Sequence, residues 1–99
     1  MPNCVIDFEF RQPAEKHMGL VSCSLQVEGY EPQTYWLWDK TVEMAELRTR
    51  LIELKDHTMI GYVIHLAEAR CFHALGLDAR EWKWRDLALE WKWLSLIHI

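Results

Sequence analysis

Residues 5–10, with the sequence VIDFEF, place two acidic residues two positions apart within an apolar run. Successive side chains of a β-strand point to opposite faces, so Asp7 and Glu9 are predicted to lie on one face of a strand. A carboxylate among apolar neighbours is costly unless it is paired or bound to a cation, and two adjacent carboxylates repel each other. The pattern therefore predicts a divalent metal ion that prefers oxygen ligands.

The composition is that of one small globular domain. The chain has 99 residues, of which 51% are hydrophobic, and its mean hydropathy is −0.17. A chain of this length forms at most one domain. Its longest apolar runs are too short to cross a bilayer, and its first residues lack the basic start of a signal peptide. We therefore expect a soluble protein without a membrane partner.

The cysteine content indicates the cellular compartment, and the net charge indicates which kind of partner is expected. Cys4, Cys23 and Cys71 are odd in number and form no CxxC pair, which argues against a disulfide framework or zinc site and favours the cytoplasm. The net charge is −4. Proteins that hold phosphates by electrostatics alone are usually basic, so an acidic chain that handles nucleic acid is expected to need metal ions.

The order of the predicted elements indicates an α/β fold on a mixed sheet. Apolar alternation predicts strands, and a recurrence of apolar residues at three and four positions predicts helices. Asp39 or Thr41 is expected to cap the first helix, Gly76 to end the second, and Asp86 to cap a third from about Leu87. The predicted strands are 3–10, 19–27, 33–38 and 57–62; the first helix carries Met44, Leu47, Leu51 and Leu54, and the second spans 66–75.

A third acid lies on the apolar side of the second predicted helix. Glu68, Phe72 and Leu75 are spaced so that they share one stripe, and this stripe is expected to face the sheet. One interpretation is structural, since an acid in the first turn stabilises a helix by about 0.3–1 kcal/mol through the helix dipole. The other is functional, because sites of α/β proteins form where strands end.

Two segments carry a resemblance to a known family. Asp7-Phe8-Glu9 resembles the Asp-x-Glu motif of DEDD 3′–5′ exonucleases, and residues 61–70 resemble the segment that brings the next acid, with Glu68 where the family usually has Asp. In particular, the chain resembles the proofreading domain of phage and bacterial family-A DNA polymerases. The resemblance implies a ribonuclease H-like three-layer α/β fold. Its mixed sheet would have antiparallel first three strands, with residues 1–94 forming a partial exonuclease domain.

The same resemblance implies an activity and its participants. Asp7, Glu9 and Glu68 would hold two Mg²⁺ or Mn²⁺ ions, and Phe10 and Arg11 would contact the terminal base or its phosphate. The implied substrate is the 3′ end of single-stranded DNA, and a polymerase domain is implied in the same full-length chain.

The carboxyl-terminal part departs from the family pattern. No Tyr-x-x-x-Asp or His-x-x-x-Asp follows Glu68, and residues 95–99 resemble translated sequencing adapter, so we expect a truncated reading frame with a non-native tail. A fragment that lacks this motif is expected to be weak or inactive. The alternative is a non-catalytic ribonuclease H-like module that binds nucleic acid or a protein.

Overall fold

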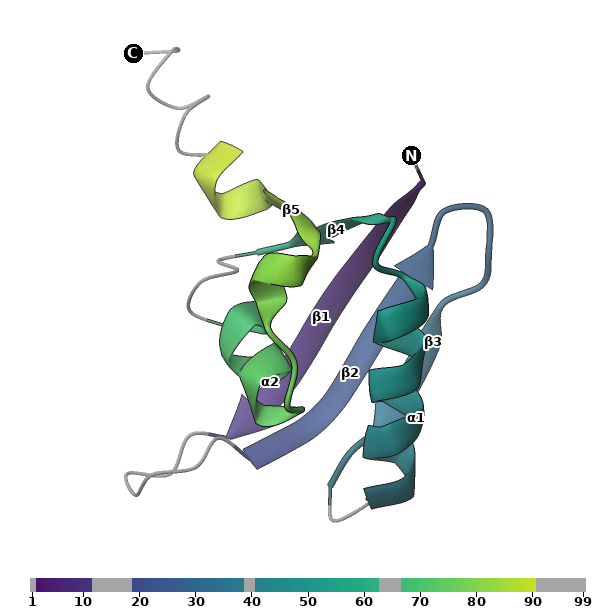
Figure 1. Cartoon of the computed structure of the whole chain (residues 1–99), viewed down its shortest axis with the longest axis vertical. Coiled ribbons are helices and arrows are strands. Elements are labelled where there is room, and N and C mark those ends of the chain that lie inside the picture. The colour runs from purple at the N-terminus through teal and green to yellow at the C-terminus, as the bar shows by residue number, and fades with distance from the viewer. Residues whose placement is uncertain (1, 12–18, 39–40, 63–66, 91–99) are drawn as a thin grey trace.

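The chain folds around one five-stranded sheet (Figure 1). The computed structural model describes residues 2–11, 19–38, 41–62 and 67–90, so the predicted tail at 95–99 and most of the predicted turn at 11–17 lie outside the described residues. A helical turn at 87–90 follows the last strand. The elements in order are β1 (Asn3–Arg11), β2 (Gly19–Val27), β3 (Gln33–Trp36), α1 (Thr41–Glu53), β4 (Thr58–Gly61), α2 (Glu68–Ala74), the 3-10 helix η1 (Ala79–Glu81) and β5 (Lys83–Asp86).

The strand order across the sheet is β3-β2-β1-β4-β5. Antiparallel pairing joins β1 to β2 and β2 to β3, whereas β1 to β4 and β4 to β5 are parallel. The predicted mixed sheet is confirmed, and the antiparallel pattern stops at β1. The change to parallel pairing follows from the chain connections. Two parallel neighbouring strands need a crossover between them, and α1 lies in the crossover before β4 and α2 in the one before β5.

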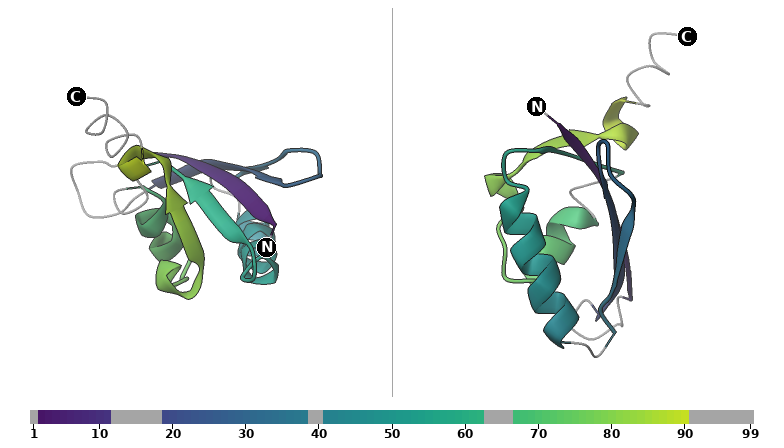
Figure 2. Two further views of the ribbon diagram at one scale, coloured as in Figure 1. Left: turned by 90° about the horizontal axis from the view of Figure 1, so that it is seen from above. Right: turned by 90° about the vertical axis from the view of Figure 1, so that its right-hand side faces the viewer.

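Both long helices pack on the same face of the sheet (Figure 2). On β1 the residues under the helices, Cys4, Ile6 and Phe8, are buried, whereas Asp7 and Glu9 are exposed on the opposite face. In the described part of the chain no helix covers that opposite face. The described residues therefore form two layers, where three were expected.

The helices follow the predicted apolar spacing. Leu47, Leu51 and Leu54 are fully buried, as their recurrence predicts. Helix α2 ends at Ala74, and Gly76 adopts a φ of 77° just beyond it. The backbone N–H groups of Gly76 and Leu77 donate to the carbonyl oxygens of His73 and Phe72, both at 2.9 Å. This is a Schellman ending, so the predicted role of Gly76 is confirmed.

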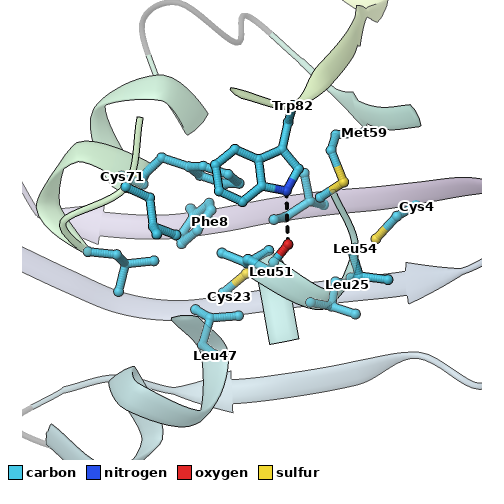
Figure 3. Packing of buried hydrophobic residues seen from close by; sticks show 14 of the residues in the cluster. Cys4, Phe8, Cys23, Leu25, Leu47, Leu51, Leu54, Met59, Cys71 and Trp82 are labelled. Atoms are coloured by element: carbon cyan, nitrogen blue, oxygen red, sulfur yellow. Dashed lines mark hydrogen bonds between the residues drawn. The ribbon is translucent and has the colours of Figure 1, made fainter. Parts of the chain in front are cut away.

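Aromatic rings join α2 to the sheet and to the segment 82–84 at the start of β5, and Figure 3 labels Phe8 and Trp82 among them. The ring of Phe72 is fully buried and meets three other rings edge to face. Its centroid lies 6.1 Å from that of Phe8, 5.0 Å from that of Trp82 and 5.1 Å from that of Trp84. Such edge-to-face pairs add about 0.5–1.5 kcal/mol each beyond the burial of their area. Trp82 thus belongs to the hydrophobic core, and Trp84 packs against it.

Two strand predictions need correction. The third strand ends at Trp36 rather than at residue 38. Strand β5 was not predicted, although its sequence KWRD alternates: Lys83 and Arg85 are exposed, and Trp84 packs against the core. A four-residue strand carries only two residues per face, which is too short a pattern to separate from a turn by periodicity.

Candidate acidic site

Asp7 and Glu9 lie on one face of β1, as predicted, but they are not buried. Of their apolar neighbours only Val5 shares that face, and it is 51% exposed. Ile6 and Phe8 point the other way into the core. The expectation of carboxylates in apolar surroundings is therefore wrong, because strand alternation separates residues that are adjacent in sequence.

Asp7 lies beside the carboxyl end of β4. Parallel pairing of β1 with β4 ends at Val5 and Ile60, so Asp7 is two residues beyond the last pair. Strand β4 ends at Gly61, and the next helix, α2, begins at Glu68. The edge of β1 at Asp7 is thus next to strand ends, where binding sites of open α/β sheets form.

Glu68 is the first residue of α2 and is buried, with 2% of its surface exposed. It shares the buried stripe with Phe72 and Leu75, as predicted. Its Oε2 atom is buried and has no hydrogen-bond partner. An unpartnered buried carboxylate oxygen is a large free-energy cost in the ionised state, so this side chain requires a proton or a cation.

The acid–base chemistry of Glu68 connects it to two other acids. Burial is the main reason that its pKa is raised to about 7. The negative charges of Asp7 and Asp86 add to the rise in this pKa, and a hydrogen bond with the residue's own backbone opposes it. Asp7 and Asp86 thus lie close enough to Glu68 to raise its pKa, although the three residues belong to three elements. We call Asp7, Glu68 and Asp86 the acidic site.

Asp86 was predicted as a helix cap. The structure confirms the cap and also places Asp86 at the end of a strand, in the acidic site. Its Oδ1 accepts a hydrogen bond of 2.9 Å from the backbone N–H of Ala88 at the start of the helical turn 87–90. It is also the last residue of β5, opposite Gly61 at the end of β4. An acid at the carboxyl end of a parallel strand indicates a binding site in an α/β sheet. The sequence analysis did not use this signal for Asp86, because it did not predict β5.

The other predicted site residues lie apart from this cluster. Glu9 is two residues beyond Asp7, about 7 Å along the strand, and is not among the charges that shift the pKa of Glu68. Phe10 packs against the hydrophobic core. The guanidinium carbon of Arg11 lies 5.5 Å from the ring centroid of Trp38, a contact that the sequence analysis did not anticipate.

The acidic site is an open arrangement. Among residues 2–11, 19–38, 41–62 and 67–90, no three His, Cys, Asp or Glu side chains converge closely enough to hold a metal ion as they stand. What fits a cation is the chemistry of the donor set: a buried carboxylate with an unpartnered oxygen beside two further acids. Hard divalent ions take such oxygen ligands and complete their coordination with water.

The cysteines do not extend this chemistry. Cys4, Cys23 and Cys71 are buried as thiols rather than as disulfides. Burial, with a smaller contribution from the charge of Glu68, raises the pKa of Cys71 to about 12. Burial likewise raises the pKa of Cys23, and the charges of both Asp7 and Glu68 add to it. Since the thiolate is the reactive form, these thiols behave as small apolar core residues.

Comparisons with known proteins leave the site to be interpreted from its own geometry. No family model matches the sequence, and neither curated proteins nor solved structures give a match. In the described residues no helix is both long and apolar enough to cross a membrane.

Proposed function

We propose that this chain belongs to a metal-dependent 3′–5′ exonuclease domain of ribonuclease H-like type. Its substrate would be the 3′ end of single-stranded DNA, and it would act in the cytoplasm beside a polymerase domain on the same polypeptide. The observation that carries the proposal is Glu68, a carboxyl buried to 2% exposure with an unpartnered oxygen beside Asp7 and Asp86.

The position of the acids supports the proposal. Asp7 comes from the first strand, Glu68 from the start of the helix after β4, and Asp86 from the end of β5. A structural acid at a helix start is normally exposed, where it stabilises the helix dipole at little desolvation cost. Burial of Glu68 beside like charges opposes stability, and costs of this kind concentrate at functional sites.

The fold supports the same proposal. An antiparallel meander, β1-β2-β3, is extended by the parallel strands β4 and β5 after helical crossovers. This arrangement is compatible with the mixed sheet of ribonuclease H-like proteins. The resemblance of Asp7-Phe8-Glu9 and of residues 61–70 to the exonuclease motifs then falls on the elements that border the acidic site.

Each residue would have a role in the proposed site. Asp7, Glu9 and Glu68 would hold the ions, and the guanidinium of Arg11 would contact phosphate. Two divalent ions would supply Lewis-acid activation of the phosphodiester and a water of lowered pKa. With its pKa at about 7, the carboxyl of Glu68 holds a proton for part of the time at neutral pH, and this proton would leave when a cation binds.

Digestion of end-labelled DNA tests the activity. A single-stranded oligonucleotide labelled at its 5′ end is incubated with the chain and Mn²⁺ or Mg²⁺. We expect a ladder of products shortened from the 3′ end, with slow turnover, and no products in chelator. Asp7→Asn and Glu68→Gln remove charge with little change in volume and are each expected to abolish the ladder.

The matched control is Glu31→Gln, which removes an acid from the exposed segment between β2 and β3. It is expected to leave the ladder unchanged. A ladder that persists in Asp7→Asn contradicts the site. A folded chain that neither binds Mn²⁺ nor shortens DNA contradicts the proposal and favours a non-catalytic binding module.

A further inference from the structure

The sheet face that carries Asp7 and Glu9 also carries two exposed tryptophans. Trp36 is 61% exposed and Trp38 is 49% exposed. Their neighbours in sequence turn the other way: Leu37 is buried in the core, and Tyr35 packs against it. Alternation along β3 therefore places Trp36 on the face opposite the helices. Trp38 lies two residues beyond the end of β3, and its ring meets the guanidinium of Arg11, whose strand position is on that face. Large apolar side chains exposed together on one face of a small domain indicate an interaction site.

The strand register places this aromatic pair beside the proposed site. Trp36 pairs with Ser22 on β2, and Ser22 pairs with Glu9 on β1. The three residues form one row across the face, so the backbones at Trp36 and Glu9 are two strand spacings apart, about 10 Å. The neighbouring row is polar, with Asp7 paired to Ser24 and the hydroxyls of Ser24 and Thr34 3.1 Å apart.

Arg11 adds a fixed positive charge to the pair. Its guanidinium carbon lies 5.5 Å from the ring centroid of Trp38, which is within the range of a cation–π contact. It lies on β1 opposite Gly19, which has no side chain to block the path across β2. A guanidinium that stacks through its face keeps its edge N–H donors available for a phosphate.

We propose that Trp36, Trp38 and Arg11 form a platform that binds single-stranded DNA by base stacking and one phosphate contact. Single-strand binding surfaces combine aromatic rings, on which successive bases stack, with cations that follow the backbone. They cover about 4–16 nucleotides, so one strand reaches from the platform to Glu9. The inference rests on the proposed exonuclease function and assigns its substrate-binding surface to the face of β3 and β1 that lies opposite the helices.

The residues around the tryptophans favour a nucleic-acid strand over a protein segment. Tryptophan and arginine also anchor protein interfaces, but such interfaces are depleted of charged groups at their centre, whereas Arg11 lies directly at Trp38. The platform borders Glu9 and Asp7, both exposed on the same face. Exposed carboxylates repel phosphates, so a strand stacked on the tryptophans depends on Arg11 and on cations in solution to offset these charges.

Binding is measured with the full chain by fluorescence anisotropy of a labelled single-stranded oligothymidylate, once with Ca²⁺ and once in chelator. A second oligonucleotide of the same length carries abasic sites in place of bases. We expect the wild-type chain to bind the thymidylate at least about tenfold more tightly than the abasic strand, because stacking requires bases. Equal affinities overturn the platform, and this comparison needs no variant.

Substitutions then locate the binding. Trp36→Ala and Trp38→Ala are each expected to weaken binding about tenfold, Trp36→Phe to retain most of it, and Arg11→Gln to reduce the salt dependence. The matched control is Tyr30→Ala, which removes an exposed aromatic ring from the turn after β2. Thermal unfolding of each variant confirms the fold. Full affinity in Trp36→Ala and Trp38→Ala, or conversion of a wild-type dimer to monomer by them, overturns the platform.

The outcomes separate the platform from the exonuclease. Tryptophan-dependent binding without DNA shortening supports the platform and contradicts the activity. DNA shortening with an unchanged KM in both tryptophan variants supports the activity and contradicts the platform.

Discussion

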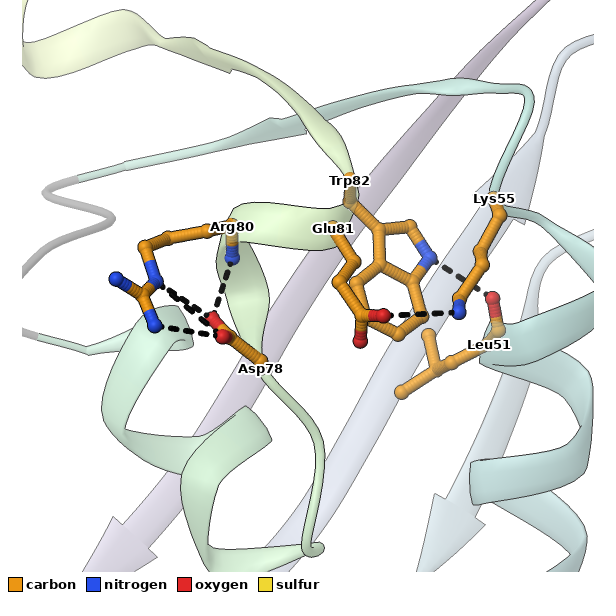
Figure 4. Close-up of polar contacts among 6 residues, drawn as sticks. All are labelled: Leu51, Lys55, Asp78, Arg80, Glu81 and Trp82. Carbon is orange, nitrogen blue, oxygen red and sulfur yellow. Dashed lines mark hydrogen bonds and ion pairs between the residues drawn. The ribbon is translucent and has the colours of Figure 1, made fainter.

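The indole Nε1 of Trp82 donates a hydrogen bond of 2.9 Å to the backbone carbonyl oxygen of Leu51 (Figure 4). Leu51 lies in the last turn of α1, and its carbonyl oxygen also accepts a hydrogen bond of 3.1 Å from the backbone N–H of Leu54. The bond from Trp82 therefore adds a second donor at this carbonyl and joins α1 to the segment that leads into β5. Lys55 lies over the Trp82 ring, with its Nζ 5.1 Å from the ring centroid and 3.5 Å from Oε1 of Glu81.

Trp82→Phe tests how much this bond stabilises the fold. Phenylalanine keeps an aromatic ring against Phe72 but removes the indole donor, so the carbonyl oxygen of Leu51 retains the backbone N–H of Leu54 alone. A hydrogen bond contributes about 0.5–1.5 kcal/mol net, so the free energy of unfolding is expected to fall by about that amount in urea titrations. The control Trp36→Phe changes an exposed ring and is expected to shift it by less than about 0.5 kcal/mol.

The raised pKa of Glu68 makes stability depend on pH. The ordinary pKa of a glutamate is near 4.5, and that of Glu68 is about 7 in the folded chain. Between these values the folded state keeps a proton that the unfolded state has released, so the free energy of unfolding falls as pH rises. Above pH 7 the loss is complete and amounts to about 3 kcal/mol for a shift of this size.

Glu68→Gln is expected to remove this dependence. A neutral amide has no proton to lose, so in chelator the variant should be more stable than the wild type at pH 8, with little difference at pH 4. Urea titrations from pH 4 to 8 measure the free energy of unfolding of the wild type and of Glu68→Gln, with Glu31→Gln as the exposed control. A wild-type chain whose stability does not fall between pH 5 and 7 relative to Glu68→Gln contradicts the buried state of Glu68.

The helices and most strands could be predicted because their signals are local and repeated. Leu47, Leu51 and Leu54 recur over two turns, and Gly76 lies at a position whose left-handed backbone conformation favours glycine. Strand β5 could not be predicted with the same ease. Its four residues become a strand through parallel pairing with β4, a contact between segments more than twenty positions apart.

The candidate site could be predicted in its residue types and in part of its geometry. Asp7 and Glu68 were identified from motif spacing, and the shared face of Asp7 and Glu9 follows from strand alternation. Their exposure could not be predicted, because it depends on which face the helices cover. Asp86 and the contact between Arg11 and Trp38 depend on strand order, which single-sequence patterns do not report.

The cysteines are expected to be unreactive in the folded chain. Cys4, Cys23 and Cys71 are fully buried, and burial raises the pKa of each thiol. A disulfide exchange reagent at pH 8 should therefore label them only as fast as the chain opens. Full labelling is expected in urea. Rapid labelling of one thiol without urea would show that its part of the core opens separately, contrary to the single cluster seen here.

Mn²⁺ is expected to stabilise the chain through the acidic site. A ligand that binds only the folded state adds about 2.7 kcal/mol at 100 times its Kd, which raises the midpoint of thermal unfolding, and chelator should reverse the rise. The effect should be larger at pH 8 than at pH 6, because at pH 6 protons compete for Glu68, whose pKa is about 7. Asp7→Asn is expected to reduce the shift strongly, whereas Glu31→Gln should keep it. Equal shifts in these two variants would place the Mn²⁺ outside the acidic site.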